Sequence, residues 1–171
     1  MNDPASSCGI VVEIAVESPL WETFGEAENL ARQAVSAVLA HVAADIRPGA
    51  ELSFLFCDDA TIQELNRRWR GQDKPTNVLS FPSGAAVGEA LSLGDIVIAF
   101  ETMAREATQE GKSLAAHFVH LTVHGLLHLL GYDHETDDEA EAMEETERQI
   151  LADLGIDDPY RLAVADTAGA P

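Results

Sequence analysis

Apolar and polar residues alternate in the first part of the chain, and apolar residues recur at helical spacing further on. The β-branched alternation predicts a strand over residues 10–17, and a second strand-like run covers residues 51–57. Between them, apolar positions that return every fourth residue predict a helix over 26–45, which Pro48 and Gly49 end.

Further strands and helices follow in the middle and the second half of the chain. Asp58 and Asp59 precede an amphipathic segment and predict a capped helix that ends near Arg70. The segments after it are a polar turn over 71–76, a strand over 77–81, a surface loop over 83–91 and a central strand over 94–100. The last elements are helices over residues 101–110, 113–130 and 137–154.

These elements predict a single α+β domain, in which helices cover a mixed sheet of about four strands. A chain of 171 residues suits one domain with a sizeable core. We expect the domain to span residues 10–156, with a flexible N-terminus over 1–9 and a disordered tail over 157–171.

Composition narrows the class of protein. A hydrophobic content of 46% argues against global disorder. The first residues lack the basic start and apolar run of a signal peptide, and no apolar stretch approaches the roughly 20 residues that span a bilayer. We therefore expect a soluble cytoplasmic protein with no membrane partner.

The net charge of the chain bears on whether it could bind nucleic acid. A formal net charge of −20 argues against non-specific binding of nucleic acid. Four of the ten basic residues nevertheless fall close together, at Arg67, Arg68, Arg70 and Lys74, and this patch could contact a phosphate. The acidic run over residues 133–147 is interpreted as a solvated helix face.

Five of the six histidines lie close together, at His117, His120, His124, His128 and His134. Residues four apart on a helix are about 40° apart around the axis and about 6 Å apart along it, so His124 and His128 can share one ion. His120 and His128 are about 12 Å apart along the axis, which is too far for a shared metal.

The third ligand must therefore come from the chain beyond the helix. Gly131 can adopt the left-handed conformation that ends helices, and His134 can then fold back towards the pair. Three histidines leave a fourth position for water, which indicates a catalytic zinc ion at His124, His128 and His134. His117 and His120 are interpreted as packing or supporting residues, Asp133 as at most a supporting residue, and His41 as structural.

The histidine spacing is that of metzincin proteases, in which a glutamate follows the first histidine as the general base. This chain has Gly125 at that position. A metallopeptidase is therefore the second hypothesis, and the base would have to come from a substrate oxygen or from a carboxylate outside the helix.

Two segments carry a resemblance to a known family. The run from His124 to His134 and the upstream run Pro75-Thr-Asn-Val-Leu-Ser-Phe-Pro82 resemble the signatures of the YbeY family of bacterial metal-dependent endoribonucleases. The resemblance extends over roughly residues 10–155. It places the family's zinc ligands on His124, His128 and His134 and its functionally important arginine on Arg70. Asn77 stands where the family often has aspartate.

The resemblance implies the substrate and partners. They are single-stranded RNA, small-subunit ribosomal RNA in particular, and the small ribosomal subunit or its assembly factors. DNA is not an expected substrate. In this hypothesis Arg70 holds the phosphate and stabilises charge in the transition state. A third hypothesis is a non-catalytic ribosome assembly factor with a structural metal.

Overall fold

The structure, a computed structural model, describes residues 9–42 and 45–160. A four-stranded sheet forms its centre, with the strands in the order β1-β2-β4-β3. The strands are β1 (Val11–Val16), β2 (Glu51–Cys57), β3 (Val78–Pro82) and β4 (Ser92–Ala99). The β1–β2 and β2–β4 pairs are parallel and the β3–β4 pair is antiparallel, so the predicted mixed sheet is confirmed.

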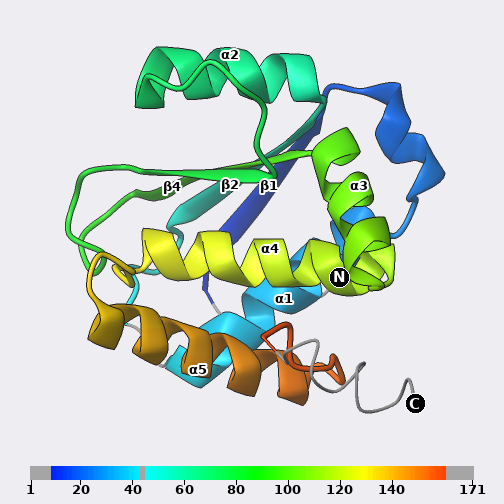
Figure 1. Cartoon of the computed structure of the whole chain (residues 1–171). Helices are drawn as coiled ribbons and strands as arrows, with labels where there is room; N and C mark the ends of the chain where they lie inside the picture. Colours follow the sequence, from blue (N-terminus) through cyan, green and yellow to red (C-terminus); the bar gives the residue numbers. More distant parts are fainter. Residues whose placement is uncertain (1–8, 43–44, 161–171) are drawn as a thin grey trace, which may run out of the picture.

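The described residues form five α-helices around the sheet: α1 (Ala27–Val42), α2 (Asp59–Arg70), α3 (Phe100–Glu110), α4 (Leu114–Leu129) and α5 (Asp137–Asp153). In Figure 1, α1, α4 and α5 lie on one side of the sheet and α2 lies on the other. A short 3-10 helix, η2 (Pro19–Thr23), follows β1 and was not predicted from the sequence. None of the described helices is long and apolar enough to cross a lipid bilayer.

The sheet separates two apolar regions, and strand β4 contributes side chains to both. Ile96 and Ile98 belong to the main core under α1 and α4, whereas Val97 and Ala99 belong to a smaller cluster with Ile62 of α2. A strand that is buried on both faces has a continuous apolar sequence, which is why this strand could be predicted as central.

Helix α4 is buried around most of its circumference. Along its middle, the positions that keep partial exposure are His120, His124 and His128, four residues apart. The stripe that they form faces an open pocket, while the apolar remainder of the helix packs on the sheet and on α1 and α5. This packing fixes the orientation of the histidines.

The predicted flexible termini lie largely outside the described residues. Residues 1–8 of the predicted flexible N-terminus and residues 161–171 of the predicted tail lie outside the described part of the chain. Tyr160 is described, and its hydroxyl donates to Glu147 at 2.6 Å. The first residues of the predicted tail therefore contact the domain.

Candidate metal centre

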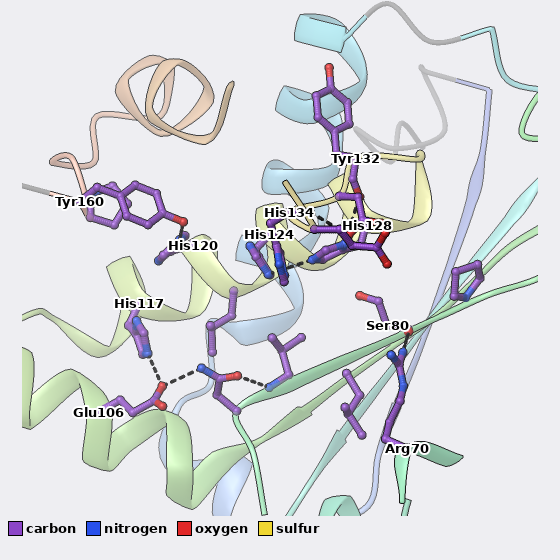
Figure 2. Close-up of a pocket in the computed structure, with 18 of the residues that line it drawn as sticks. Arg70, Ser80, Glu106, His117, His120, His124, His128, Tyr132, His134 and Tyr160 are labelled. Atoms are coloured by element: carbon purple, nitrogen blue, oxygen red, sulfur yellow. Dashed lines mark hydrogen bonds and ion pairs between the residues drawn. The ribbon is translucent and has the colours of Figure 1, made fainter. Parts of the chain in front are cut away.

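The three histidines predicted as ligands lie together. One ring nitrogen from each of His124, His128 and His134 lies within 4.8 Å of the other two. His124 and His128 come from α4, and His134 comes from the loop after it (Figure 2). Gly131 turns the chain here with φ of 102°, and the amide of Tyr132 donates to Leu127 at 3.0 Å.

The hydrogen bonds of the imidazoles define which nitrogen faces the ligand position. The Nδ1 of His124 lies 3.0 Å from a carboxylate oxygen of Glu147, and the Nδ1 of His128 lies 3.1 Å from the backbone oxygen of Tyr132. Both partners can only accept a hydrogen bond, so both Nδ1 atoms carry the proton. In the neutral rings the two Nε2 atoms consequently carry no proton, and each bare nitrogen has a lone pair available for a ligand.

The two bare nitrogens lie 3.2 Å apart. Lone pairs at that separation repel each other unless a cation lies between them. Two imidazoles bound tetrahedrally at about 2.0–2.1 Å would have nitrogens about 3.3–3.4 Å apart, close to the spacing found here. Burial, then the neighbouring His124 and His134, lower the pKa of His128 and favour its neutral, metal-binding form. The residues present therefore fit a metal ion.

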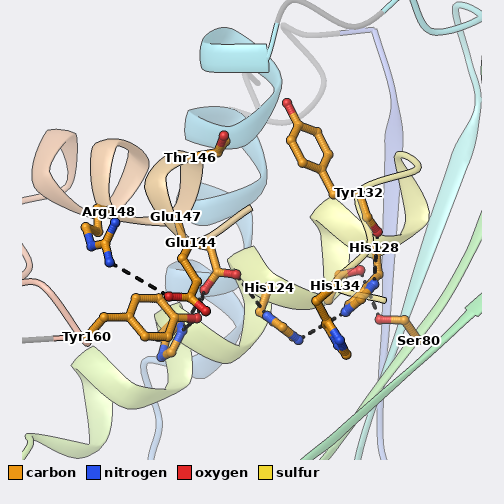
Figure 3. A network of polar contacts seen from close by, with 12 residues as sticks. Ser80, His124, His128, Tyr132, His134, Glu144, Thr146, Glu147, Arg148 and Tyr160 are labelled. Atoms are coloured by element: carbon orange, nitrogen blue, oxygen red, sulfur yellow. Dashed lines mark hydrogen bonds and ion pairs between the residues drawn. The ribbon is translucent and has the colours of Figure 1, made fainter. Parts of the chain in front are cut away.

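Glu147 of α5 hydrogen-bonds to the Nδ1 of His124, the ring nitrogen that does not face the ligand position (Figure 3). Its side chain is fully buried, and it accepts from the Nε2 of His120 at 2.8 Å, as well as from His124 and from Tyr160. Burial alone would raise the pKa of Glu147, but hydrogen bonds from His120, His124 and Tyr160 outweigh it and lower the pKa to about 2. A carboxylate in this position orients the imidazole and strengthens it as a ligand.

The sequence-based interpretation of the run 133–147 as a solvated helix face is wrong at Glu147. A signal for its burial exists in the sequence. Glu147 lies four residues after Met143 and three before Ile150, both of which are buried, and so falls within the apolar stripe of α5. A single carboxylate on such a stripe indicates a buried polar partner, here the histidines of α4.

Asp133 also contributes, as a support for the loop. Its side-chain oxygen accepts from the backbone amide of His134 at 2.7 Å, which holds the exposed ligand loop in place. The supporting role considered for Asp133 is therefore exerted on the backbone of His134.

Arg70 lies in the wall of the same pocket, at the end of α2. Its Nη2 donates to the backbone oxygen of Ser80 at 2.6 Å, and its guanidinium lies over the ring of Phe81 at 5.4 Å. A guanidinium has five N–H donors, so one bond to a carbonyl leaves capacity for a further acceptor. The pocket has a volume of about 890 Å³ and also receives the three histidines.

Gly125, the position of the metzincin glutamate, faces the sheet. A Cβ atom there would lie 3.1 Å from both Ile96 Cγ2 and Ser80 Oγ, and the hydroxyl of Ser80 donates to the Gly125 oxygen at 2.9 Å. A glutamate at this position would meet the sheet, because α4 packs so closely there that even a Cβ atom would be in tight contact with Ile96 and Ser80. The structure thus gives a packing reason for the missing carboxylate.

Comparison with known proteins gives a family match over most of the chain. The family model for Endoribonuclease YbeY matches residues 20–155. The Endoribonuclease YbeY of Methylocella silvestris is 52% identical over 155 residues, covering 91% of this chain and 88% of that protein. The protein of the same name from Beijerinckia indica is 57% identical over 157 residues, covering 88% of this chain and 77% of that protein.

A solved structure agrees at the level of the fold. The solution structure of a Thermotoga maritima protein aligns with a TM-score of 0.50 and 21% identity, covering 90% of this chain and 99% of that one. The family match spans most of the chain, including α4 with its histidines. The chain therefore belongs to the YbeY family of endoribonucleases.

Proposed function

We propose that this protein is a zinc-dependent endoribonuclease that cleaves single-stranded RNA in ribosomal RNA maturation. The observation that carries the metal site is the pair of bare Nε2 atoms of His124 and His128, which face each other at 3.2 Å beside an open pocket. The RNA substrate rests on membership of an endoribonuclease family.

Zinc is proposed from the chemistry of the donor set. Three neutral imidazoles suit zinc, and a three-ligand site retains the open coordination position that catalytic zinc sites have. When bound, the ion would polarise a phosphoryl oxygen and lower the pKa of a water molecule to about 7. Glu147 and the backbone oxygen of Tyr132 hold the protons on the Nδ1 atoms, so that both Nε2 atoms stay available.

Arg70 is proposed to bind the phosphate. Its contacts with the oxygen of Ser80 and the ring of Phe81 hold the guanidinium against the pocket wall. A guanidinium held in advance in a partly enclosed pocket stabilises negative charge without reorganising during the reaction. Its planar shape also allows it to donate to two phosphate oxygens at once.

The metallopeptidase hypothesis is less well supported. It requires a general base after the first histidine, and that position is Gly125, which packs against Ile96 of the sheet. The structural-metal hypothesis is also less well supported, because His134 is exposed and the site opens into a large pocket. Closed structural zinc sites have four protein ligands.

The setting of the reaction is part of the proposal. An enzyme of this kind would act in the cytoplasm on small-subunit ribosomal RNA, in contact with the small ribosomal subunit or its assembly factors, and would take part in ribosome quality control. It would not act on DNA.

A comparison of substrates tests the proposal. The zinc-loaded protein is incubated separately with single-stranded RNA, with DNA of the same sequence and with an unstructured peptide, with and without a chelator. We expect chelator-sensitive cleavage of the RNA alone. Chelator-sensitive cleavage of the peptide with intact RNA would overturn the proposal in favour of a peptidase.

A further inference from the structure

A second polar cluster lines the same pocket, away from the three histidines. Glu106 of α3 accepts through one carboxylate oxygen, Oε1, from Nδ2 of Asn77 at 2.9 Å and from Nε2 of His117 at 2.9 Å. Figure 2 shows Glu106 and His117 together, at a distance from His124 and His128. All three members of the cluster line the pocket.

The cluster fixes Glu106 in one orientation. Asn77 is held in turn, because its Oδ1 accepts from the amide of Val78 at 2.6 Å. His117 is almost completely buried, and burial lowers its pKa, so the neutral ring donates from Nε2 to the carboxylate. Its Nδ1 is buried and has no hydrogen-bond partner among the described residues.

The carboxylate has unused capacity. Each carboxylate oxygen can accept about two hydrogen bonds, and Oε1 already accepts two. No described residue hydrogen-bonds to Oε2. The Glu106 side chain is 30% exposed, so a bound molecule can reach it. Neither Asn77 nor a neutral His117 supplies a positive charge to Glu106, which lines the pocket as a fixed carboxylate with one oxygen that no described residue contacts by a hydrogen bond.

The negative charge of Glu106 restricts which part of an RNA could bind beside its carboxylate. A carboxylate repels a phosphate, so its partner must be a neutral donor of the nucleotide: an exocyclic amino group of a base or the 2′ hydroxyl of a ribose. The position suits a nucleotide next to the scissile phosphate. His117 and His124 are seven residues apart on α4, which places them about 10.5 Å apart along the helix axis.

We propose that Glu106, held by Asn77 and His117, is a recognition site for a neutral hydrogen-bond donor of the nucleotide that flanks the scissile phosphate. This inference rests on the proposed endoribonuclease function and adds a specificity-determining residue to it. It also explains the asparagine at position 77, since an aspartate could not donate to Glu106 and would place a second negative charge beside it.

Glu106→Gln is the most informative variant. The amide oxygen of the glutamine can keep both bonds from Asn77 and His117, and this places the NH₂ group where Oε2 was. The internal contacts are thereby retained while the free acceptor becomes a donor. Glu110→Gln is the matched control, because Glu110 lines the same pocket but pairs with Lys112 at 2.8 Å.

The test uses the zinc-loaded full chain and single-stranded RNA oligonucleotides altered at one nucleotide at a time. One series carries a single 2′-deoxy substitution, and the other replaces an adenine or guanine by the analogue without its exocyclic amino group. The value of kcat/KM, the affinity for an uncleavable oligonucleotide and the melting temperature are measured for each protein.

For the wild type and Glu110→Gln, we expect one of the two alterations, at one position near the cleavage site, to reduce kcat/KM at least about tenfold. In Glu106→Gln the same alteration should cost less than about threefold, at an unchanged melting temperature. The series that responds identifies the donor as a base amino group or a ribose hydroxyl.

If the same alteration of the RNA lowered kcat/KM equally in the wild type and in Glu106→Gln, the inference would be overturned. Glu106 would then serve only to connect α3 to α4 through its hydrogen bond with His117. Wild-type cleavage that no alteration weakens more than about twofold would also overturn it, even if the variant did not fold. Both results would leave the proposed function standing, whereas a wild type that does not cleave RNA would remove both.

Discussion

At the scale of single residues, the candidate metal site consists of three histidines and of the buried Glu147, which hydrogen-bonds to one of them. His124, His128 and His134 follow from the helical period and a helix-ending glycine, and the structure brings them together. Glu147 could not be separated from its acidic neighbours by composition. Its place in the apolar stripe of α5 signals that it is buried, but its partners are set by the docking of α5 against α4, a contact between distant segments that no local pattern encodes.

Glu147→Gln tests the support of the metal ligand. The substitution removes the charge that holds the proton on His124 Nδ1, and loss of such a partner typically costs 10–100-fold in metal affinity. We expect a loss in that range from competition with a zinc indicator, with Glu144→Gln, on the same helix, unchanged. Wild-type zinc affinity in Glu147→Gln would show that the buried carboxylate serves only to join the two helices.

Arg70→Ala tests the phosphate contact. We expect retained zinc and melting temperature but a loss of turnover of about 10²–10³-fold, the range for removal of one preorganised donor. Arg70→Lys should recover only part of this loss, because an ammonium lacks the planar fork. Since Arg70 also bonds to the oxygen of Ser80, the alternative is a lower melting temperature with normal turnover per folded molecule. That pattern would contradict the phosphate role.

At the scale of elements, the sequence patterns were sufficient to find every strand and α-helix of the described chain to within about two residues, except at the end of α1, which was predicted at residue 45 and lies at Val42. The predicted N-cap at Asp58 is confirmed by its bond from the amide of Thr61 at 2.9 Å. The element that was not predicted, η2, has only five residues, which are too few to show a repeating pattern of apolar positions. Its Trp21 contributes by stacking on Phe56, at 4.6 Å between ring centroids.

The close contact of α4 with the sheet leads to a stability prediction at Gly125. Alanine gains about 1 kcal/mol in helix propensity, but overpacking against a buried neighbour costs about 1–3 kcal/mol. Because Ile96 is fully buried, we expect the cost to prevail and Gly125→Ala to lower the free energy of unfolding by up to about 2 kcal/mol.

The control for this measurement is Gly25→Ala, because a Cβ at Gly25 would meet no atom within 4 Å. Denaturant titration of both variants compares the two sites directly. A Gly125→Ala protein as stable as the control would mean that the interface between helix and sheet is looser than the structure indicates.

At the scale of the whole molecule, membership of an endoribonuclease family confirms the enzyme class that was inferred from two motifs. The net charge of −20 has to be reconciled with an RNA substrate. The basic patch around α2 is partly neutralised, because Arg67 and Arg68 both lie within 4.0 Å of Glu64.

This charge distribution predicts a weak dependence of RNA binding on salt. Each phosphate neutralised on a single strand contributes about −0.7 to the slope of log affinity against log salt. With a small patch on an acidic molecule, we expect a slope no steeper than about −3, equivalent to a few phosphates. Fluorescence anisotropy with a labelled, uncleavable oligonucleotide provides the slope. A slope that corresponds to eight or more phosphates would show that the RNA follows a different surface.

The most direct test of the central proposal joins metal content to RNA cleavage in one pair of variants. His128→Ala removes one of the two imidazoles that face each other at 3.2 Å, whereas His41→Ala removes a histidine on α1 that pairs with Asp153 at 3.8 Å. Both are purified exactly as the wild type is, and zinc per chain and cleavage of single-stranded RNA are measured on the same preparations. We predict about one zinc per chain and full cleavage for the wild type and His41→Ala, and loss of both in His128→Ala. Full zinc content or undiminished cleavage in His128→Ala would contradict the proposed metal site.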